Sequence, residues 1–128
     1  MRTIIRVGLG SGLGGGLRSF IDLFIFNLGL LAVPISILFI NVTGSFFIGY
    51  LVGLWKKNGP IPGNKWHFWV TGFCGGYTTF SAFSWQIMDL VHQGEGMLSG
   101  AYAASSIAFG LVAVWLGVLL AILRSKTT

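Results

Sequence analysis

The stretch TGFCGGYTTFSAFS, residues 71 to 84, places glycines and hydroxyl side chains in the middle of an otherwise apolar segment. Gly75 and Gly76 weaken a helix, and the threonines and serines that follow can hydrogen-bond the backbone that is released. Lipid offers no hydrogen-bond partners, so an interrupted helix is tolerated at membrane depth only where protein or a polar cavity surrounds it. This stretch therefore predicts a membrane fold with its functional centre at the break.

The composition around this stretch is that of a membrane protein. Of 128 residues, 54% are hydrophobic and 9% are charged, against roughly 25% charged in soluble domains, and the mean hydropathy is +0.81. A membrane-spanning helix needs about 20 mainly apolar residues. Four segments qualify: residues 4–26, 31–55, 66–91 and 98–123. We expect a single all-α integral membrane domain over residues 1–128, with four transmembrane helices and the third helix broken mid-membrane.

Basic residues gather on one side of the expected fold. With four spans, both termini and the connection 56–65 share one side of the membrane, and the two opposite connections contain no Lys or Arg. The basic residues on the shared side are Arg2, Arg6, Lys56, Lys57, Lys65, Arg124 and Lys126. The positive-inside rule makes this side cytoplasmic, which predicts a multi-pass plasma (cytoplasmic) membrane protein with both termini in the cytoplasm. Placement at span ends is typical of lipid-facing anchors and argues against nucleic acid as a partner.

Two polar residues inside the spans are candidates for function. Arg18 is costly at membrane depth, by ~2.5 kcal/mol or more near a helix centre. It can pair with Asp22 one turn further on, reach the outer interface, or line a vestibule that attracts anions. Asn41 can bridge helices or offer amide donors to an anion. The residues alone leave these alternatives open.

Hydroxyls and rings in the third and fourth spans offer further contacts. Phe80 and Phe83 are three residues apart and share a helix face, where most such pairs are packing, although positive ring edges can also receive an anion. The hydroxyls of Tyr102 and Ser106 can donate to an anion or bond within their own helix. Carbonyls freed at a helix break can coordinate a small cation.

Glycines at four-residue spacing let helices approach closely in lipid. Those that predict packing here are Gly8, Gly12 and Gly16 in the first span and Gly49 and Gly53 in the second.

The chain has few groups suited to catalysis. It contains one cysteine, two histidines and three acidic residues. They form no metal-ligand spacing, nucleophile with a base, or carboxylate pair. We expect a protein that is not an enzyme.

Taken together, these residues make the chain resemble the CrcB/Fluc family of fluoride channels, small four-span proteins that export fluoride. The resemblance extends over all four spans, and the long third-span motif is its most specific part. The matching patches are the glycine-rich first span ending at Arg18, Asn41-Val42-Thr43-Gly44, the segment from Gly72 to Ser84, and Tyr102 with Ser106.

The resemblance implies an antiparallel, dual-topology-type dimer with two fluoride pores at its interface and a central structural sodium ion. It implies fluoride-selective, passive export and fluoride resistance. The backbone carbonyls of Gly75 and Thr78 of each subunit would hold sodium, and Arg18 would lie at a vestibule. The fluoride pore would be lined by Asn41, Phe80, Phe83, Thr79, Ser81, Tyr102 and Ser106.

Three residues depart from the family pattern: Ile37 and Ala82 replace threonines, and Gln86 replaces a carboxylate. The one-sided charge also conflicts with insertion in both orientations. The second subunit would then be the same chain or an oppositely inserted homologue, and the chain could be a non-transporting partner in a heterodimeric fluoride channel. A further alternative is a small proton-coupled multidrug or cation exporter, with Asp22 as its membrane carboxylate.

Overall fold

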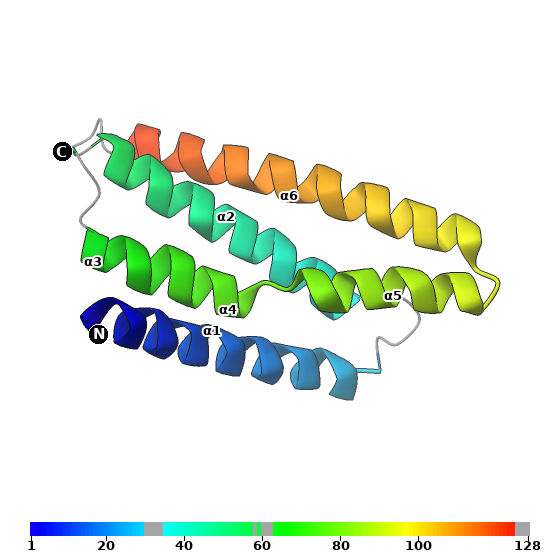
Figure 1. Ribbon diagram of the computed structural model, residues 1–128. Helices are drawn as coiled ribbons and strands as arrows, with labels where there is room; N and C mark the ends of the chain where they lie inside the picture. The colour runs from blue at the N-terminus through cyan, green and yellow to red at the C-terminus, as the bar shows by residue number, and fades with distance from the viewer. Residues whose placement is uncertain (30–34, 58, 60–62, 125–128) are drawn as a thin grey trace.

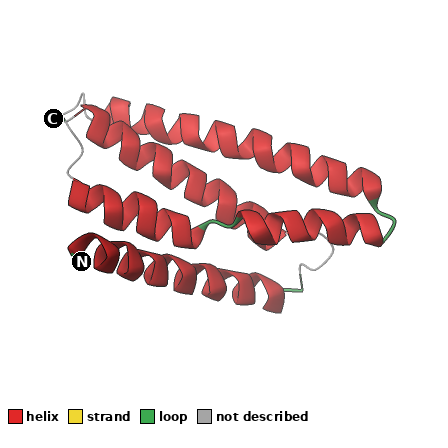
Figure 2. Cartoon of the chain, in the orientation of Figure 1, coloured by secondary structure: helices red, strands yellow, loops and turns green. Residues whose placement is uncertain are grey.

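The computed structural model of the chain is all-helical in the residues it describes, which are 1–29, 35–57, 59 and 63–124. The helices run side by side (Figure 1), and the loops of the described residues, drawn in green, are short (Figure 2). The elements are α1 (Arg2–Asn27), α2 (Ile35–Lys57), α3 (Gly63–Lys65), the π-helix η1 (Trp66–Cys74), α4 (Gly75–Tyr77), α5 (Phe80–His92) and α6 (Gly96–Arg124). Residues 31–34 of the expected second span, the side chain of Lys57, and Lys126 lie outside what the structure describes.

Glycines bring α1 into close contact with η1 and α4. A Cβ on Gly10 would come within 3.0 Å of the Gly72 Cα, and a Cβ on Gly76 within 2.7 Å of the Ser11 Cα. At Gly14, a Cβ would overlap the backbone of α4 and η1. Ser11 Oγ also donates to the Gly72 carbonyl at 3.3 Å. The interface therefore tolerates no side chain at these glycines without separation of the helices.

The glycines that sequence spacing selects in the first span do not pack against another helix within the described part of this chain. A Cβ on Gly8, Gly12 or Gly16 would meet nothing within 4 Å. The packing glycines lie two residues away in register, at Gly10 and Gly14, and two residues correspond to about 200° around an α-helix. Six glycines between residues 8 and 16 allow either register, so spacing alone could not choose the buried face.

The glycine prediction for the second span is confirmed. A Cβ on Gly49 would lie 2.9 Å from the Val114 Cα, and one on Gly53 would lie 2.8 Å from the Ala121 Cβ. Gly117 makes the reciprocal approach toward α2. Close packing thus joins α2 to α6 along one side, as it joins α1 to η1 and α4 on the other.

Within the described residues, two helical stretches are long and apolar enough to cross a membrane, Ile35–Lys56 and Gly96–Arg124. The other two expected spans do not reach the length and hydropathy of a membrane-crossing helix, and each has a physical reason. In α1 the six glycines, Arg18 and Asp22 lower the hydropathy. The third helical run is divided, because α4 ends at Tyr77 and α5 begins at Phe80.

The start of α1 and the ends of α2 and α6 lie at the same end of the bundle (Figure 1). Basic residues of the described chain follow that arrangement, since Arg2 and Arg6 lie at the start of α1, Lys56 in the last turn of α2, and Arg124 at the end of α6. Arg124 Nη1 donates to the Tyr50 hydroxyl at 3.2 Å. The fold therefore has one strongly basic end.

Candidate functional site

The site is built around two residues of extended backbone between α4 and α5. Thr78 has φ −80° and ψ 160°, and Thr79 has φ −148° and ψ 125°. Thr79 is also the N-cap of α5, because its Oγ1 accepts a hydrogen bond from Ala82 N at 3.2 Å. Extended threonines with a capping hydroxyl are a favourable local way to stop one helix and begin another.

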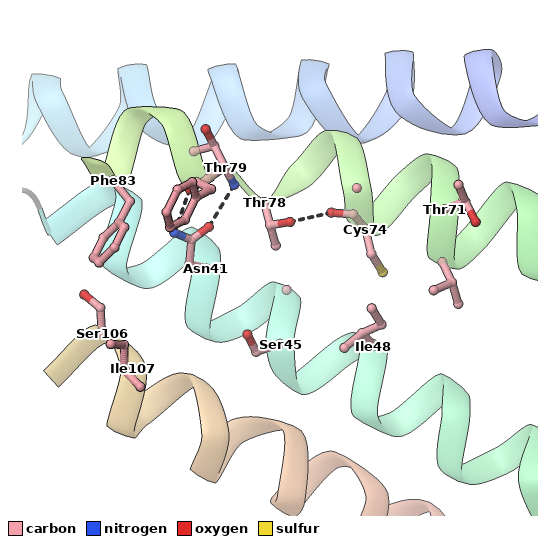
Figure 3. A pocket seen from close by; sticks show the side chains of 14 residues that line it. Asn41, Ser45, Ile48, Thr71, Cys74, Thr78, Thr79, Phe83, Ser106 and Ile107 are labelled. Atoms are coloured by element: carbon pink, nitrogen blue, oxygen red, sulfur yellow. Dashed lines mark hydrogen bonds between the residues drawn. The ribbon is translucent and has the colours of Figure 1, made fainter. Parts of the chain in front are cut away.

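Asn41 of α2 holds this extended segment through two hydrogen bonds. Thr79 N donates to Asn41 Oδ1 at 2.9 Å, and Asn41 Nδ2 donates to the Thr79 carbonyl at 3.0 Å (Figure 3). One amide side chain thereby satisfies both backbone groups of Thr79 that the break releases. The interpretation of Asn41 as a bridge between helices is confirmed, and its contact with an anion stays a prediction.

The same hydrogen bonds leave two carbonyls without their helical donors. In a continuous α-helix, Thr79 N would donate to the Gly75 carbonyl and Ala82 N to the Thr78 carbonyl, four residues earlier. Here Thr79 N is bonded to Asn41 and Ala82 N to the Thr79 hydroxyl. Gly75 and Thr78 are the residues whose carbonyls the resemblance assigns to sodium. Neutral carbonyl oxygens suit a small hard cation, so the donor set fits that ion.

A cavity of about 510 Å³, which we call the trough, opens beside the break. Its lining includes Asn41, Gly75, Thr78, Phe80, Phe83 and Ser106. Figure 3 shows Asn41 and Thr79 at one part of it, with Phe83 and Ser106 close together and Cys74 further along. The trough therefore brings together both proposed sodium ligands and five of the seven predicted pore residues, Thr79 among them.

The two predicted pore aromatics lie next to each other but differ in exposure. Phe80 is 79% exposed, whereas Phe83 is half-buried. Their ring centroids are 5.9 Å apart with the planes tilted by 45°. Phe83 in turn contacts the Tyr102 ring at 5.6 Å. Phe83 is thus supported from behind by α6, and Phe80 projects from the surface of the chain.

The hydroxyls of α6 have different surroundings. Tyr102 is only 3% exposed and its hydroxyl donates to Gln86 Oε1 at 2.8 Å, so the structure places it behind Phe83 and away from the trough lining. Ser106 lines the trough, and its buried Oγ has no hydrogen-bond partner among the described residues. Ser106 is therefore the α6 residue with a hydroxyl free to donate there.

A second cavity, of about 310 Å³, also has Thr79 in its lining, and we call it the outer cavity. Its lining combines charged, hydroxyl and apolar side chains: Arg18, Ser19, Asp22, Ile37, Thr79, Ser81 and Ala82. Ser81 Oγ and Thr79 Oγ1 are 3.2 Å apart and hydrogen-bonded. Thr79 lines both cavities, so the two are neighbours at the break.

Arg18 and Asp22 both line the outer cavity, yet no ion pair with an N–O distance of 4.0 Å or less joins them in the described structure. The pairing that their spacing suggested is not formed.

Two of the residues that depart from the family pattern also line the outer cavity. Ile37 is 5% exposed in the core cluster with Ile40 and Tyr77, and Ala82 packs against that cluster.

Sequence reasoning missed two contacts that position the site. It treated Gln86 only as a departure, although Gln86 accepts the Tyr102 hydrogen bond. It did not connect Thr43 with Tyr77, whose hydroxyls are 2.9 Å apart and fasten α2 to α4. Each contact joins residues far apart in the sequence. No local sequence pattern indicates which hydroxyl and amide side chains will meet across such a separation.

Comparisons with known proteins find similarity over most of the chain. Residues 5–118 match the family described as CrcB-like protein, Camphor Resistance (CrcB). A protein of Rhizobium meliloti (strain 1021) named fluoride-specific ion channel FluC is 40% identical over 126 residues, 98% of each chain. The FluC of Azobacteroides pseudotrichonymphae is 38% identical over 94% of this chain and 96% of its own. That of Paramagnetospirillum magneticum is 39% identical over 91% of this chain and 93% of its own.

Proposed function

This chain belongs to the CrcB family, and from that membership we propose that it is a fluoride-selective ion channel that exports fluoride passively. The observation that carries the proposal is similarity over nearly the whole length to relatives named as fluoride-specific ion channels. Its family and its apolar helices make it a membrane protein. Its relatives are named as channels rather than enzymes.

The fluoride path would run from the outer cavity past Thr79 into the trough. Fluoride is small and strongly hydrated, so a narrow path has to replace its water with donors without holding it too tightly to leave. Donors along this route are the Ser81 hydroxyl, the unpartnered Ser106 hydroxyl and the second N–H of Asn41 Nδ2, since only one N–H is needed by Thr79. The ring edges of Phe80 and Phe83 would add positive potential without a full charge.

Tyr102 would contribute to this pore indirectly, through its contact with Phe83. Its ring contacts Phe83, and its hydroxyl is bonded to Gln86. In this arrangement Tyr102 would fix the orientation of Phe83 while Ser106 supplies the hydroxyl that meets the ion.

The Gly75 and Thr78 carbonyls of two subunits would together hold a structural sodium ion. What supports this is that both carbonyls have lost their helical N–H donors to Asn41 and Thr79. When bound, the ion would supply a positive charge that ties the two interrupted helices to each other. Two carbonyls from one chain are fewer oxygens than a hard cation requires, so the site needs a second subunit.

An antiparallel second subunit would cover the trough. Gly75 and Phe80 are exposed in the single chain, and backbone carbonyls that lack their helical donors are unfavourable groups to present to lipid. Pairing of two breaks about a two-fold axis would bury both features and form two pathways, one on each side of the ion.

The one-sided charge favours a partner that is an oppositely inserted homologue. Arg2, Arg6, Lys56 and Arg124 gather at the end where α1 begins and where α2 and α6 end, while Asp89 and Glu95 lie by the opposite turn between α5 and α6. The positive-inside rule would hold this chain in one orientation in the plasma membrane, with both termini in the cytoplasm. An antiparallel dimer of chains with a fixed orientation requires a different chain with the reverse bias.

Expression in a bacterial strain without a fluoride exporter tests the proposal. We expect growth in fluoride with the wild-type chain, alone or with a homologue of opposite orientation, and loss of growth with Phe83→Ile. A fusion of a reporter to the C-terminus would show the cytoplasmic face only. Equal reporter signal on both faces would exclude fixed orientation, and fluoride sensitivity despite membrane insertion in every pairing would contradict the channel proposal.

A further inference from the structure

The outer cavity contains one positive and one negative side chain that do not neutralise each other by contact. Arg18 and Asp22 are four residues apart on α1, one turn from each other, and both line the cavity. Such neighbours on a helix have Cβ atoms about 5–6 Å apart and readily form ion pairs. Their N and O atoms nevertheless stay more than 4.0 Å apart in the described structure. Each charge is therefore available to an ion in the cavity.

The cavity is large enough for the two charges to act through water. Its volume is about 310 Å³, and one water occupies about 30 Å³ in the liquid. Asp22 is exposed and Arg18 is half-buried. Hydration explains why the carboxylate and the guanidinium need no direct contact at this position.

We propose that Asp22 sets the rate of anion access to the pore by opposing the attraction of Arg18. An anion that crosses the outer cavity toward Thr79 passes both side chains, because the same cavity is lined by all three. Arg18 raises the local anion concentration and Asp22 lowers it, so the cavity has almost no net charge. The inference rests on the proposed function, since it concerns the rate at which fluoride reaches the same path.

The expected size follows from Coulomb's law in a water-filled space. A unit charge about 6 Å from an anion changes its local concentration by about threefold when the dielectric constant is that of water. The effect persists at about 10 mM ionic strength, where the Debye length is about 30 Å, and is largely screened at about 1 M, where it is about 3 Å. The acidic residues Asp89 and Glu95 line neither cavity. Asp22 is therefore the acidic residue placed to change the anion concentration in the outer cavity.

The test is the initial rate of fluoride efflux from proteoliposomes, with ionic strength adjusted by an impermeant salt. At about 10 mM we expect Asp22→Asn to raise the rate about threefold and Arg18→Gln to lower it about threefold. The double variant Arg18→Gln/Asp22→Asn should return close to the wild-type rate. At an ionic strength of about 1 M the efflux rates of the variants and the wild type should become equal. Asp89→Asn, which neutralises an exposed acid outside both cavities, is the matched control and should behave as wild type.

The signs of the changes separate this mechanism from a structural ion pair. If Arg18 and Asp22 stabilised the fold as a pair, both single variants would lower the rate and the double variant would recover it at every ionic strength. That pattern would overturn the proposal, as would an Asp22→Asn rate equal to wild type or a change that salt does not reduce. Absence of wild-type efflux both from the chain alone and from the chain together with an oppositely inserted homologue would instead refute the proposed channel function and, with it, this role of Asp22.

Discussion

Replacing Asn41 by leucine should destabilise the fold, because it removes both hydrogen bonds that hold the Thr79 backbone. Leucine has a similar volume, so packing of α2 is preserved while Thr79 N and O lose their partner. Each buried polar group left unsatisfied costs about 1–3 kcal/mol, which gives about 2–6 kcal/mol for the pair. The site is only half-buried, and side-chain hydrogen bonds in membrane proteins average about 0.6 kcal/mol, so we expect a loss of about 2 kcal/mol.

The assay is reversible unfolding in mixed detergent micelles, together with amide hydrogen exchange at Thr79. Ser45→Ala is the matched control, because Ser45 lies one turn further along α2, lines the same trough and makes no hydrogen bond in the described structure. Asn41→Asp keeps an acceptor for Thr79 N and should lose less than Asn41→Leu. If Asn41→Leu unfolds at the same detergent concentration as Ser45→Ala and leaves Thr79 exchange unchanged, Asn41 does not hold the break.

Three further predictions follow from packing and from the pore. Gly14→Ala should cost about 1–3 kcal/mol in unfolding free energy because its Cβ would overlap the neighbouring backbone, while Gly12→Ala, which meets open space, should be neutral or stabilising; equal effects would refute the assigned register. Gln86→Met and Tyr102→Phe each remove the same hydrogen bond, so their effects on the unfolding free energy should be non-additive in a double-mutant cycle. Strict additivity would contradict a stabilising role for this hydrogen bond. Phe83→Ile should slow fluoride efflux sharply with little change in stability. Unchanged efflux would show that the Phe83 ring serves in packing and not in the fluoride path.

Much of the fold is predictable because hydropathy and helix breakers act locally. The apolar runs predict the positions of the long helices, and the glycines and threonines after residue 74 predict an interruption close to where α4 ends at Tyr77. The face of α1 that packs was not predictable. With glycines at 8, 10, 12, 14, 15 and 16, two opposite faces carry the same spacing, and only contact with η1 and α4 selects Gly10 and Gly14.

The site shows the same limit. Sequence selected Asn41, but whether its amide bridges helices depends on a residue 38 positions away. Arg18 and Asp22 have the spacing of an ion pair, yet the structure keeps them apart on a shared cavity. The hydroxyl of Tyr102, which the resemblance assigns to the pore lining, donates to Gln86, and the sequence did not predict this partner. In each case the outcome depends on how helices distant in sequence meet, which local periodicity does not encode.

The most direct test of the central claim is ion efflux from liposomes that contain the purified chain, with fluoride and chloride followed by selective electrodes. The account predicts rapid loss of fluoride with no loss of chloride, from vesicles with the chain alone or together with an oppositely inserted homologue. Efflux with the chain alone would establish a functional homodimer, and efflux only with the homologue would establish the heterodimer. Retention of fluoride in both preparations, or equal loss of chloride, would contradict a fluoride-selective channel.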